Sequence, residues 1–102
     1  MFISGGENIH PELIEQALIN IDGILNAVVI DMPSKTYGSR PVAFLQRQKN
    51  YNDSGLSTLL SESLMPFQIP DVFLDWPSLE FSLKPSLGQF RQIAQNKIYI
   101  WK

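Results

Sequence analysis

The sequence predicts a single small domain of the α+β class, with a mostly antiparallel sheet flanked by about three helices. Apolar residues recur at helical spacing in three separate segments, and short runs of β-branched and aromatic residues lie between them, bounded by glycine and proline. Two of these runs follow each other with no helix between them, which favours an antiparallel pair. The chain has 102 residues, 44% of them hydrophobic, which is enough for one core.

The first half of the chain is expected to form a short strand, a helix and a pair of strands. Pro11 suits the first position of the helix, and Gly23 lies where the helix should end. The next segment, ILNAVVI, predicts a buried strand, and VAFLQR predicts its partner after a loop marked by Pro33, Ser34, Gly38 and Pro41. The helix should bury one apolar face, formed by Leu13, Ile14, Ala17, Leu18 and Ile21.

The second half predicts a helix, a strand and a last helix, which completes the order β-α-β-β-α-β-α. Asp53 or Ser54 is expected to cap a leucine-rich helix that ends before Pro66. VFLDW, between two prolines, predicts a short strand, and the tail KIYIWK either extends as a strand or packs loosely. Ser86 is expected to cap the last helix. The apolar positions of the two helices are Leu56, Leu59, Leu60 and Leu64, then Leu87, Phe90, Ile93 and Ala94.

Composition excludes several classes of function. There is no cysteine, so disulfides, thiolate metal sites and a cysteine nucleophile are all excluded. Eight Lys and Arg against ten Asp and Glu, with the basic residues scattered from Lys35 to Lys102, do not suit a nucleic-acid binder. The chain shows no signal-peptide pattern and no apolar run of membrane-spanning length. We therefore expect a cytoplasmic protein with no nucleic-acid or membrane partner.

Few residues are candidates for chemistry by residue type alone. His10, the only histidine, precedes a proline-initiated helix, where a capping or surface role is more typical than that of a base. No serine lies in a nucleophile elbow, and the acidic residues form no pair or cluster typical of acid–base catalysis or metal binding. Glu12 and Glu15 suit the positive end of the helix. No metal site is expected.

Two features admit both a structural and a functional interpretation. Gly5 and Gly6 form either a hairpin turn or a place where a ligand passes close to bare backbone. Lys84 lies in the segment SLEFSLKPS, where Pro85 favours extended backbone. It is either a solvated surface lysine or a cation held against a phosphate.

Four segments in order resemble the C-terminal domain of the adenylate-forming ligases, a superfamily that includes acyl- and aryl-CoA synthetases, peptide-synthetase adenylation domains and luciferases. These segments are ISGGENIHPELIEQAL, NAVVIDMPSKTYGSRPVAFL, PFQIPDVF and the lysine within LKPS. The resemblance covers residues 2–95. Its most specific part is the ordered set GGENIHP, Tyr37-Gly38-x-Arg40-Pro41 and Phe67-x-x-Pro70.

The resemblance implies that residues 1–102 are a single domain, the C-terminal lid of a ligase without its large N-terminal domain. In such enzymes the large domain binds ATP, Mg²⁺ and a carboxylic acid, and the lid swings between two orientations. The first orientation serves formation of the acyl-adenylate, and the second serves exchange of AMP for CoA. The lid's own N-terminal domain, the acid and CoA are thus the implied partners, and the lid alone should be inactive.

The resemblance also assigns roles to particular residues. Lys84 would face the reacting carboxylate and the α-phosphate, where a cation stabilises the charge of the transition state. Gly5, Gly6 and Glu7 would line the channel for the pantetheine arm of CoA, together with Tyr37 and Phe67.

This chain departs from the family pattern at two places. The family commonly has a glycine directly before the lysine and an arginine three residues after it, where this chain has Leu83 and Leu87. Related aryl-CoA ligases carry basic residues where this chain has Ile69 and Asp71. How the phosphates of CoA are held therefore stays open.

Among the subfamilies, the segments PELIEQAL, YGSRPVAFL and LKPSLGQFRQIAQ look most like bacterial o-succinylbenzoate-CoA ligases of menaquinone biosynthesis. A fatty-acyl- or other aryl-CoA synthetase and a peptide-synthetase adenylation domain are the alternatives within the superfamily. An alternative of another class is a free-standing interaction module, which would dock a protein through apolar terminal segments that include Tyr99 and Trp101.

Overall fold

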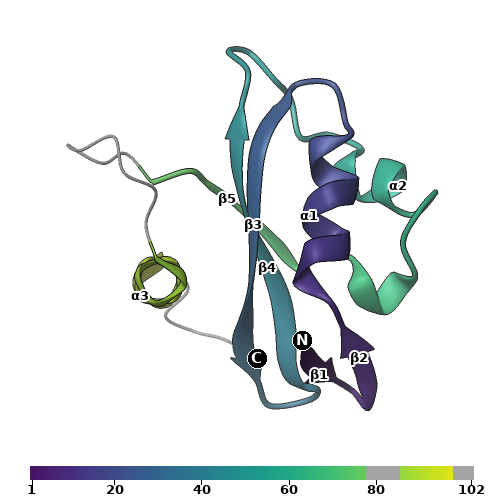
Figure 1. Cartoon of the computed structure of the whole chain (residues 1–102), viewed down its shortest axis with the longest axis vertical. Coiled ribbons are helices and arrows are strands. Elements are labelled where there is room, and N and C mark those ends of the chain that lie inside the picture. The colour runs from purple at the N-terminus through teal and green to yellow at the C-terminus, as the bar shows by residue number, and fades with distance from the viewer. Residues whose placement is uncertain (78–85, 98–102) are drawn as a thin grey trace.

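The structure, a computed structural model, describes residues 1–77 and 86–97, and it confirms the α+β class (Figure 1). The main difference from the expected order is at the start, where two short strands form a hairpin in place of one strand. The elements in chain order are β1 (Phe2–Ser4), β2 (Glu7–Ile9), α1 (Pro11–Ile19), β3 (Ile24–Ser34), β4 (Gly38–Arg47), α2 (Leu56–Leu60), the 3₁₀ turn η1 (Pro66–Gln68), β5 (Val72–Asp75) and α3 (Leu87–Lys97).

The main sheet has the strand order β3-β4-β5, and β1 and β2 form a separate two-stranded sheet. β4 is antiparallel to β3 and parallel to β5, so the sheet is mixed. β3 and β4 are longer than predicted and take in Pro33 and Pro41, which the sequence placed in the loop. The central strand β4 accommodates Pro41 because its nitrogen, which has no N–H to donate, lies on the β5 side of the strand, at a position before β5 begins. The Pro41 carbonyl on the same side accepts the N–H of Asp71.

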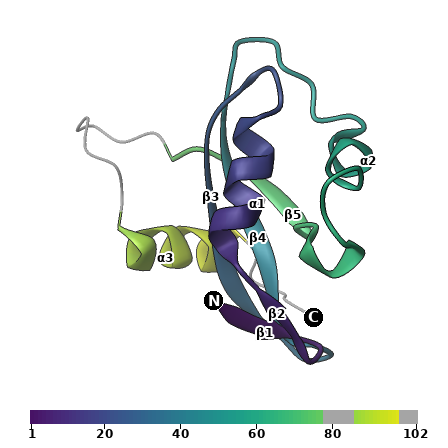
Figure 2. The ribbon, with the colours of Figure 1, turned by 45° about the vertical axis from the view of Figure 1, so that its right-hand side comes forward.

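Helices cover both faces of the main sheet. α1 and α2 lie on one face and α3 lies on the other, across the strands rather than along them (Figures 1 and 2). Successive residues of a strand point to opposite faces, so Ala27 and Val29 pack towards α1, and Val28 and Ile30 pack towards α3. Because the middle of β3 is buried on both faces, residues 27–30, AVVI, form an unbroken apolar run rather than an alternating one.

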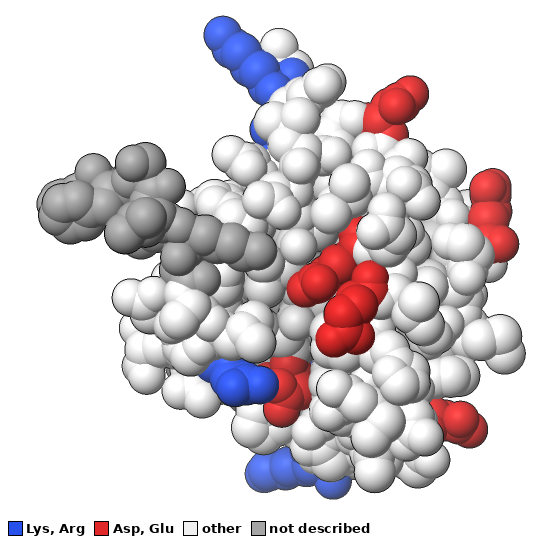
Figure 3. Space-filling view, in the orientation of Figure 1, with Lys and Arg blue, Asp and Glu red and all other residues white. Residues whose placement is uncertain are grey.

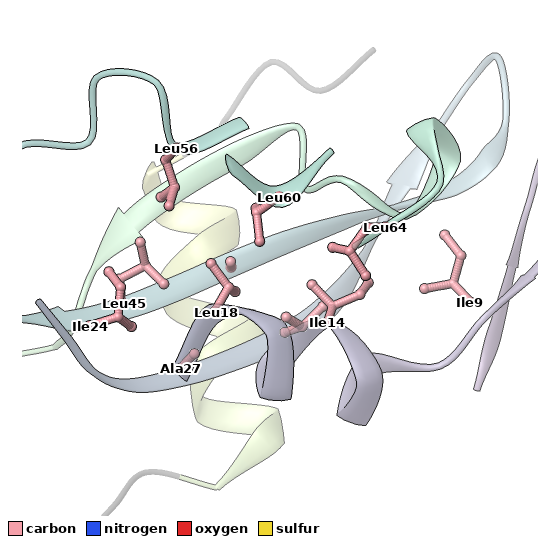
Figure 4. Packing of buried hydrophobic residues seen from close by; sticks show 11 residues of the cluster. Ile9, Ile14, Leu18, Ile24, Ala27, Leu45, Leu56, Leu60 and Leu64 are labelled. Atoms are coloured by element: carbon pink, nitrogen blue, oxygen red, sulfur yellow. The ribbon is translucent and has the colours of Figure 1, made fainter. Parts of the chain in front are cut away.

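The two faces carry separate cores. Leucines of α1 and α2 fill the first core, where they pack against side chains of β3 and β4 (Figure 4). The second core centres on Phe90 of α3, whose ring lies 4.9 Å from that of Phe44 and 5.3 Å from that of Trp76. Ser86 caps α3 as predicted: its Oγ accepts the N–H of Gln89, and the Gln89 side chain accepts the N–H of Ser86.

The predicted caps of two helices were wrong. α2 begins after Gly55, not at Asp53 or Ser54, because the Asp53 carboxylate is bound by Arg47. α1 ends at Ile19 with Asn20 as its C-cap, and Gly23 lies beyond it.

Three leucines at predicted apolar helix positions are instead exposed. These are Leu13 of α1, Leu59 of α2 and Leu87 of α3. Leu13 and Leu59 line the same groove between α1 and α2.

The outer edge of β3 is covered by side chains. The N–H of Val29 donates to the carboxylate of Glu15, at 2.8 Å, and the N–H of Ala27 donates to the Asn26 side chain. Pro33, farther along the same edge, has no N–H. Such features discourage the addition of another strand, so Glu15 has a role beyond the helix dipole.

On the side of the molecule that faces the viewer in Figure 1, the charges are mainly acidic, and the basic side chains stand apart from one another (Figure 3). No helix in the described part of the chain is long and apolar enough to cross a membrane.

Candidate functional site

A pocket of about 340 Å³ lies where the β1–β2 hairpin, the β3–β4 turn and η1 meet. Its walls come from segments far apart in the chain, and four of the residues that the sequence assigned to the pantetheine channel line it: Gly5, Glu7, Tyr37 and Phe67. Ser4, Arg40, Pro66 and Asp71 complete the lining.

The two glycines of the hairpin turn have different surroundings. Gly5 has φ +57°, its N–H donates to the Tyr37 carbonyl at 2.8 Å, and an added Cβ would lie 3.0 Å from the Tyr37 ring. Gly6 has φ +84°, and no described atom lies within 4 Å of the place of its Cβ. The turn is therefore both a hairpin turn and a stretch of accessible bare backbone beside the pocket, so the two interpretations do not exclude each other.

Arg40 of β4 is the centre of the hydrogen bonding at the pocket. Its side chain is buried, and its guanidinium donates to Ser4 Oγ at 3.0 Å, to the Phe67 carbonyl at 2.8 Å and to the Ile69 carbonyl at 3.0 Å. Two further bonds, of 2.9 Å and 2.7 Å, reach Asp71 Oδ1. One side chain thus ties β1, β4 and the segment from η1 to β5 together.

The aromatic walls differ in their exposure. Tyr37 is half exposed, and its ring lies 5.6 Å from the Arg40 guanidinium carbon, within cation–π range. Its N–H donates to Ser34 Oγ, which holds the β3–β4 turn in shape. Phe67 is partly buried against the first core. The walls can therefore contact the apolar parts of a narrow ligand.

The charges in the described lining leave no free cation in the pocket. Arg40 donates to protein acceptors with all five of its N–H groups, and Glu7 and Asp71 add two carboxylates. Ile69, through its carbonyl, and Asp71 serve as acceptors for Arg40. The arrangement suits an uncharged chain with amide groups better than a phosphate.

Other predicted residues lie elsewhere. Lys84 falls outside the described residues, as do Tyr99 and Trp101. His10 is exposed at the N-cap of α1, and its side chain makes no capping bond. Within residues 1–77 and 86–97, no group of three His, Asp or Glu side chains could hold a metal ion.

Four residues of the lining, Ser4, Arg40, Pro66 and Asp71, were not predicted as site residues from the sequence. Arg40 is the one that the sequence could have indicated. The available signal was an arginine directly before the apolar run PVAFL, at a place where the strand pattern predicts burial. Such a residue must be paired if it is buried.

A second arginine, Arg47, marks the opposite end of β4. It donates to both carboxylate oxygens of Asp53, at 2.7 and 2.6 Å, and to Asp75 at 2.6 Å. The pKa of Arg47 is raised, mainly by the hydrogen bond to Asp53. The negative charges of Asp53 and Asp75 raise this pKa further, and burial lowers it. Arg47 lies at the far end of β4 from the pocket and does not line it.

Comparison with known proteins gives a consistent picture, although no protein-family model matches the chain. The chain is 37% identical over 93 residues to the 2-succinylbenzoate–CoA ligase of Haemophilus influenzae, covering 87% of this chain and 21% of that protein. It is 31% identical over 99 residues to the same-named protein of Staphylococcus aureus, covering 97% of this chain and 19% of that protein. The chain thus spans about a fifth of the length of these curated relatives.

The structural comparison agrees with the sequence comparison. A structure of E. coli MenE with a bound analogue of OSB-AMS superposes with a TM-score of 0.81 at 30% identity, covering 93% of this chain and 20% of that one. Similarity over most of the chain therefore extends to both sequence and fold. On these grounds the chain belongs to the adenylate-forming ligase superfamily, as a C-terminal domain of the kind found in acid–CoA ligases.

Proposed function

We propose that the chain is the mobile C-terminal domain of an ATP-dependent acid–CoA ligase, which forms an acyl-adenylate and then a thioester with CoA. The observation that supports this most directly is the pocket, in which Gly5, Glu7, Tyr37 and Phe67 come together from separate segments. These are the residues that the family resemblance assigns to the pantetheine channel. The names of the relatives favour 2-succinylbenzoate as the acid.

The proposed role of the pocket is to guide the thiol of CoA to the acyl-adenylate. The pantetheine arm is narrow, uncharged and rich in amides. Bare backbone at Gly5 and Gly6 allows its close approach, and Tyr37 and Phe67 offer apolar surface. The sulfur then attacks the acyl carbonyl, the bond to the phosphate oxygen breaks, and AMP leaves. Holding the two reactants in this geometry is the catalytic contribution of the channel.

The first half-reaction is assigned to another part of the domain and to a separate, larger domain. In this proposal the large domain holds ATP, Mg²⁺ and the acid. Lys84 supplies a cation where the carboxylate attacks the α-phosphorus, because two anions must approach each other there. The domain thus serves the two half-reactions with different surfaces.

The proposal is tested with a hybrid enzyme. In the Haemophilus influenzae ligase the matched segment is replaced by this chain, and adenylate formation and thioester formation from supplied acyl-AMP are measured separately. We expect both half-reactions in the hybrid and neither from the isolated chain. A folded hybrid that performs neither half-reaction would contradict the proposal.

Two variants of the hybrid separate the two surfaces. Lys84→Ala should lower adenylate formation by about two orders of magnitude or more and spare thioester formation. Gly6→Leu should have the opposite effect, because a leucine side chain would enter the channel. Gly55→Leu is the matched control, since Gly55 also has positive φ and open space but lies at the start of α2. Equal losses in both half-reactions would argue against the assignments.

A further inference from the structure

We propose that Arg40 is the positioning residue of the pocket, and that it sets the geometry of the thioester-forming step without touching CoA. This inference rests on the proposed function. It concerns a residue to which the family resemblance assigned no role and whose environment only the structure reveals.

The guanidinium of Arg40 has no N–H group without an acceptor. Arginine has five N–H groups, and the five hydrogen bonds of Arg40, between 2.7 and 3.0 Å, use all of them. No donor is left for a phosphate or a carbonyl of a substrate. Arg40 therefore acts through the groups that it holds.

Two of the groups that Arg40 holds belong to opposite walls of the pocket. The bond to Ser4 Oγ fixes the residue just before Gly5, and the bond to the Phe67 carbonyl fixes the backbone of the aromatic wall. The hairpin belongs to a sheet of its own, so it gains no ladder of hydrogen bonds from the main sheet. Within the described residues, its polar ties to β4 and the β3–β4 turn are the Arg40–Ser4 bond and the bond from Gly5 N–H to the Tyr37 carbonyl.

No other side chain can make the set of hydrogen bonds that Arg40 makes. A lysine keeps the positive charge but has three donors on one atom, which cannot reach a hydroxyl, two carbonyls and a carboxylate in the planar arrangement of a guanidinium. Arg40→Lys should therefore keep the ion pair with Asp71 and loosen the hairpin relative to Phe67. The effect is one of geometry rather than of charge.

The test measures both half-reactions of the hybrid enzyme with Arg40→Lys. We expect KM for CoA to rise about tenfold or more in thioester formation, while adenylate formation stays within about twofold. Arg47→Lys is the matched control, because Arg47 is a partly buried, carboxylate-bound arginine at the other end of β4. It should leave both half-reactions unchanged.

The outcomes separate this inference from the proposed function. If the unmodified hybrid forms thioester and folded Arg40→Lys shows an unchanged KM for CoA, the positioning role is wrong and the proposed function stands. Equal losses in both half-reactions would also overturn it, since they indicate only a structural role. If the unmodified hybrid forms no thioester, the proposed function itself fails.

A milder variant keeps the inference testable if Arg40→Lys does not fold. Ser4→Ala removes only the bond that ties the hairpin to Arg40. It should raise KM for CoA about two- to fivefold and leave adenylate formation unchanged. An unchanged KM for CoA in folded Ser4→Ala would overturn the inference.

Discussion

The two ends of β4 carry the same residue type in similar settings, yet only Arg40 lines the candidate site. Arg40 and Arg47 both bind an aspartate next to or within β5, Asp71 in the first case and Asp75 in the second. The side chains of the arginines are similarly buried, at 10% and 16% exposure. Their partners differ: Arg40 also binds a hydroxyl and two backbone carbonyls, whereas the partners of Arg47 within residues 1–77 and 86–97 are two carboxylates.

This difference shows what an ion pair does and does not contribute to a site. At the Arg47 end the charges join β4 to Asp53 in the loop before α2 and to Asp75 of β5. At the Arg40 end the same kind of pair is extended by bonds to two other segments, and the space between those segments is the pocket. The convergence of the hairpin, the turn and η1 creates the site, and the arginine fixes it. Four experiments test this difference between the two ends of β4.

The largest difference is expected from removing each arginine. Arg40→Met leaves a buried hydroxyl, two carbonyls and a carboxylate without their donor, so it should lower the free energy of unfolding by about 3 kcal/mol. Arg47→Met should cost about 1 kcal/mol, because its partners are accessible to water. Urea unfolding of the chain followed by circular dichroism measures both. Equal losses would remove the distinction between the two ends.

The glycines near the two ends give the next largest effect. Gly23, whose carbonyl binds Gln48 beyond the Arg47 end, has φ +100°, and an added Cβ would lie 2.2 Å from the Tyr51 ring. Gly38, beside the pocket, has φ +83° with open space in the described structure. Gly23→Ala should therefore lose about 2 kcal/mol and Gly38→Ala about 1 kcal/mol.

Urea midpoints at constant slope would check the glycine prediction. A larger loss for Gly38→Ala would mean that backbone strain outweighs the contact with Tyr51.

The carboxylates of Arg47 should contribute unequally. Asp53 makes two bonds to the guanidinium and its side chain is 37% exposed, whereas Asp75 makes one bond and is 86% exposed. Asp53→Asn should lose about 1 kcal/mol, and Asp75→Asn less than about 0.5 kcal/mol. Repeating the urea curves at 1 M NaCl should shrink both differences. A larger effect at Asp75 would show that accessibility does not govern these pairs.

The smallest effect is expected from raising the pH. Hydrogen bonding to Asp53 raises the pKa of Arg47 above its already high ordinary value. A group whose pKa is raised on folding contributes stability that is lost only when the pH rises through the folded-state pKa. The difference in unfolding free energy between the natural chain and Arg47→Met should thus stay constant, within about 0.3 kcal/mol, from pH 7 to 10. A steady decline over this range would contradict the prediction.

Much of the fold follows from local pattern. The apolar spacing after Pro11, the cap at Ser86 and the segment ILNAVVI, rich in β-branched residues, each predicted an element that the structure contains. These features depend on residues close in sequence. The predicted cap of α2 was wrong because Asp53 is engaged by Arg47, a partner from another element. The parallel pairing of β5 with β4 also depends on the path of the whole chain between them.

The sequence by itself determined the class of the domain, the ordered motif and the turn at Gly5 and Gly6, since glycine content and periodicity act over a few residues. The tertiary structure alone places this turn against Tyr37 and gives Arg40 four partners from two other segments, the hairpin and the stretch from η1 to β5. A buried arginine must find acceptors for its N–H groups, and those acceptors are set by which backbone segments meet around it. No local pattern contains that information.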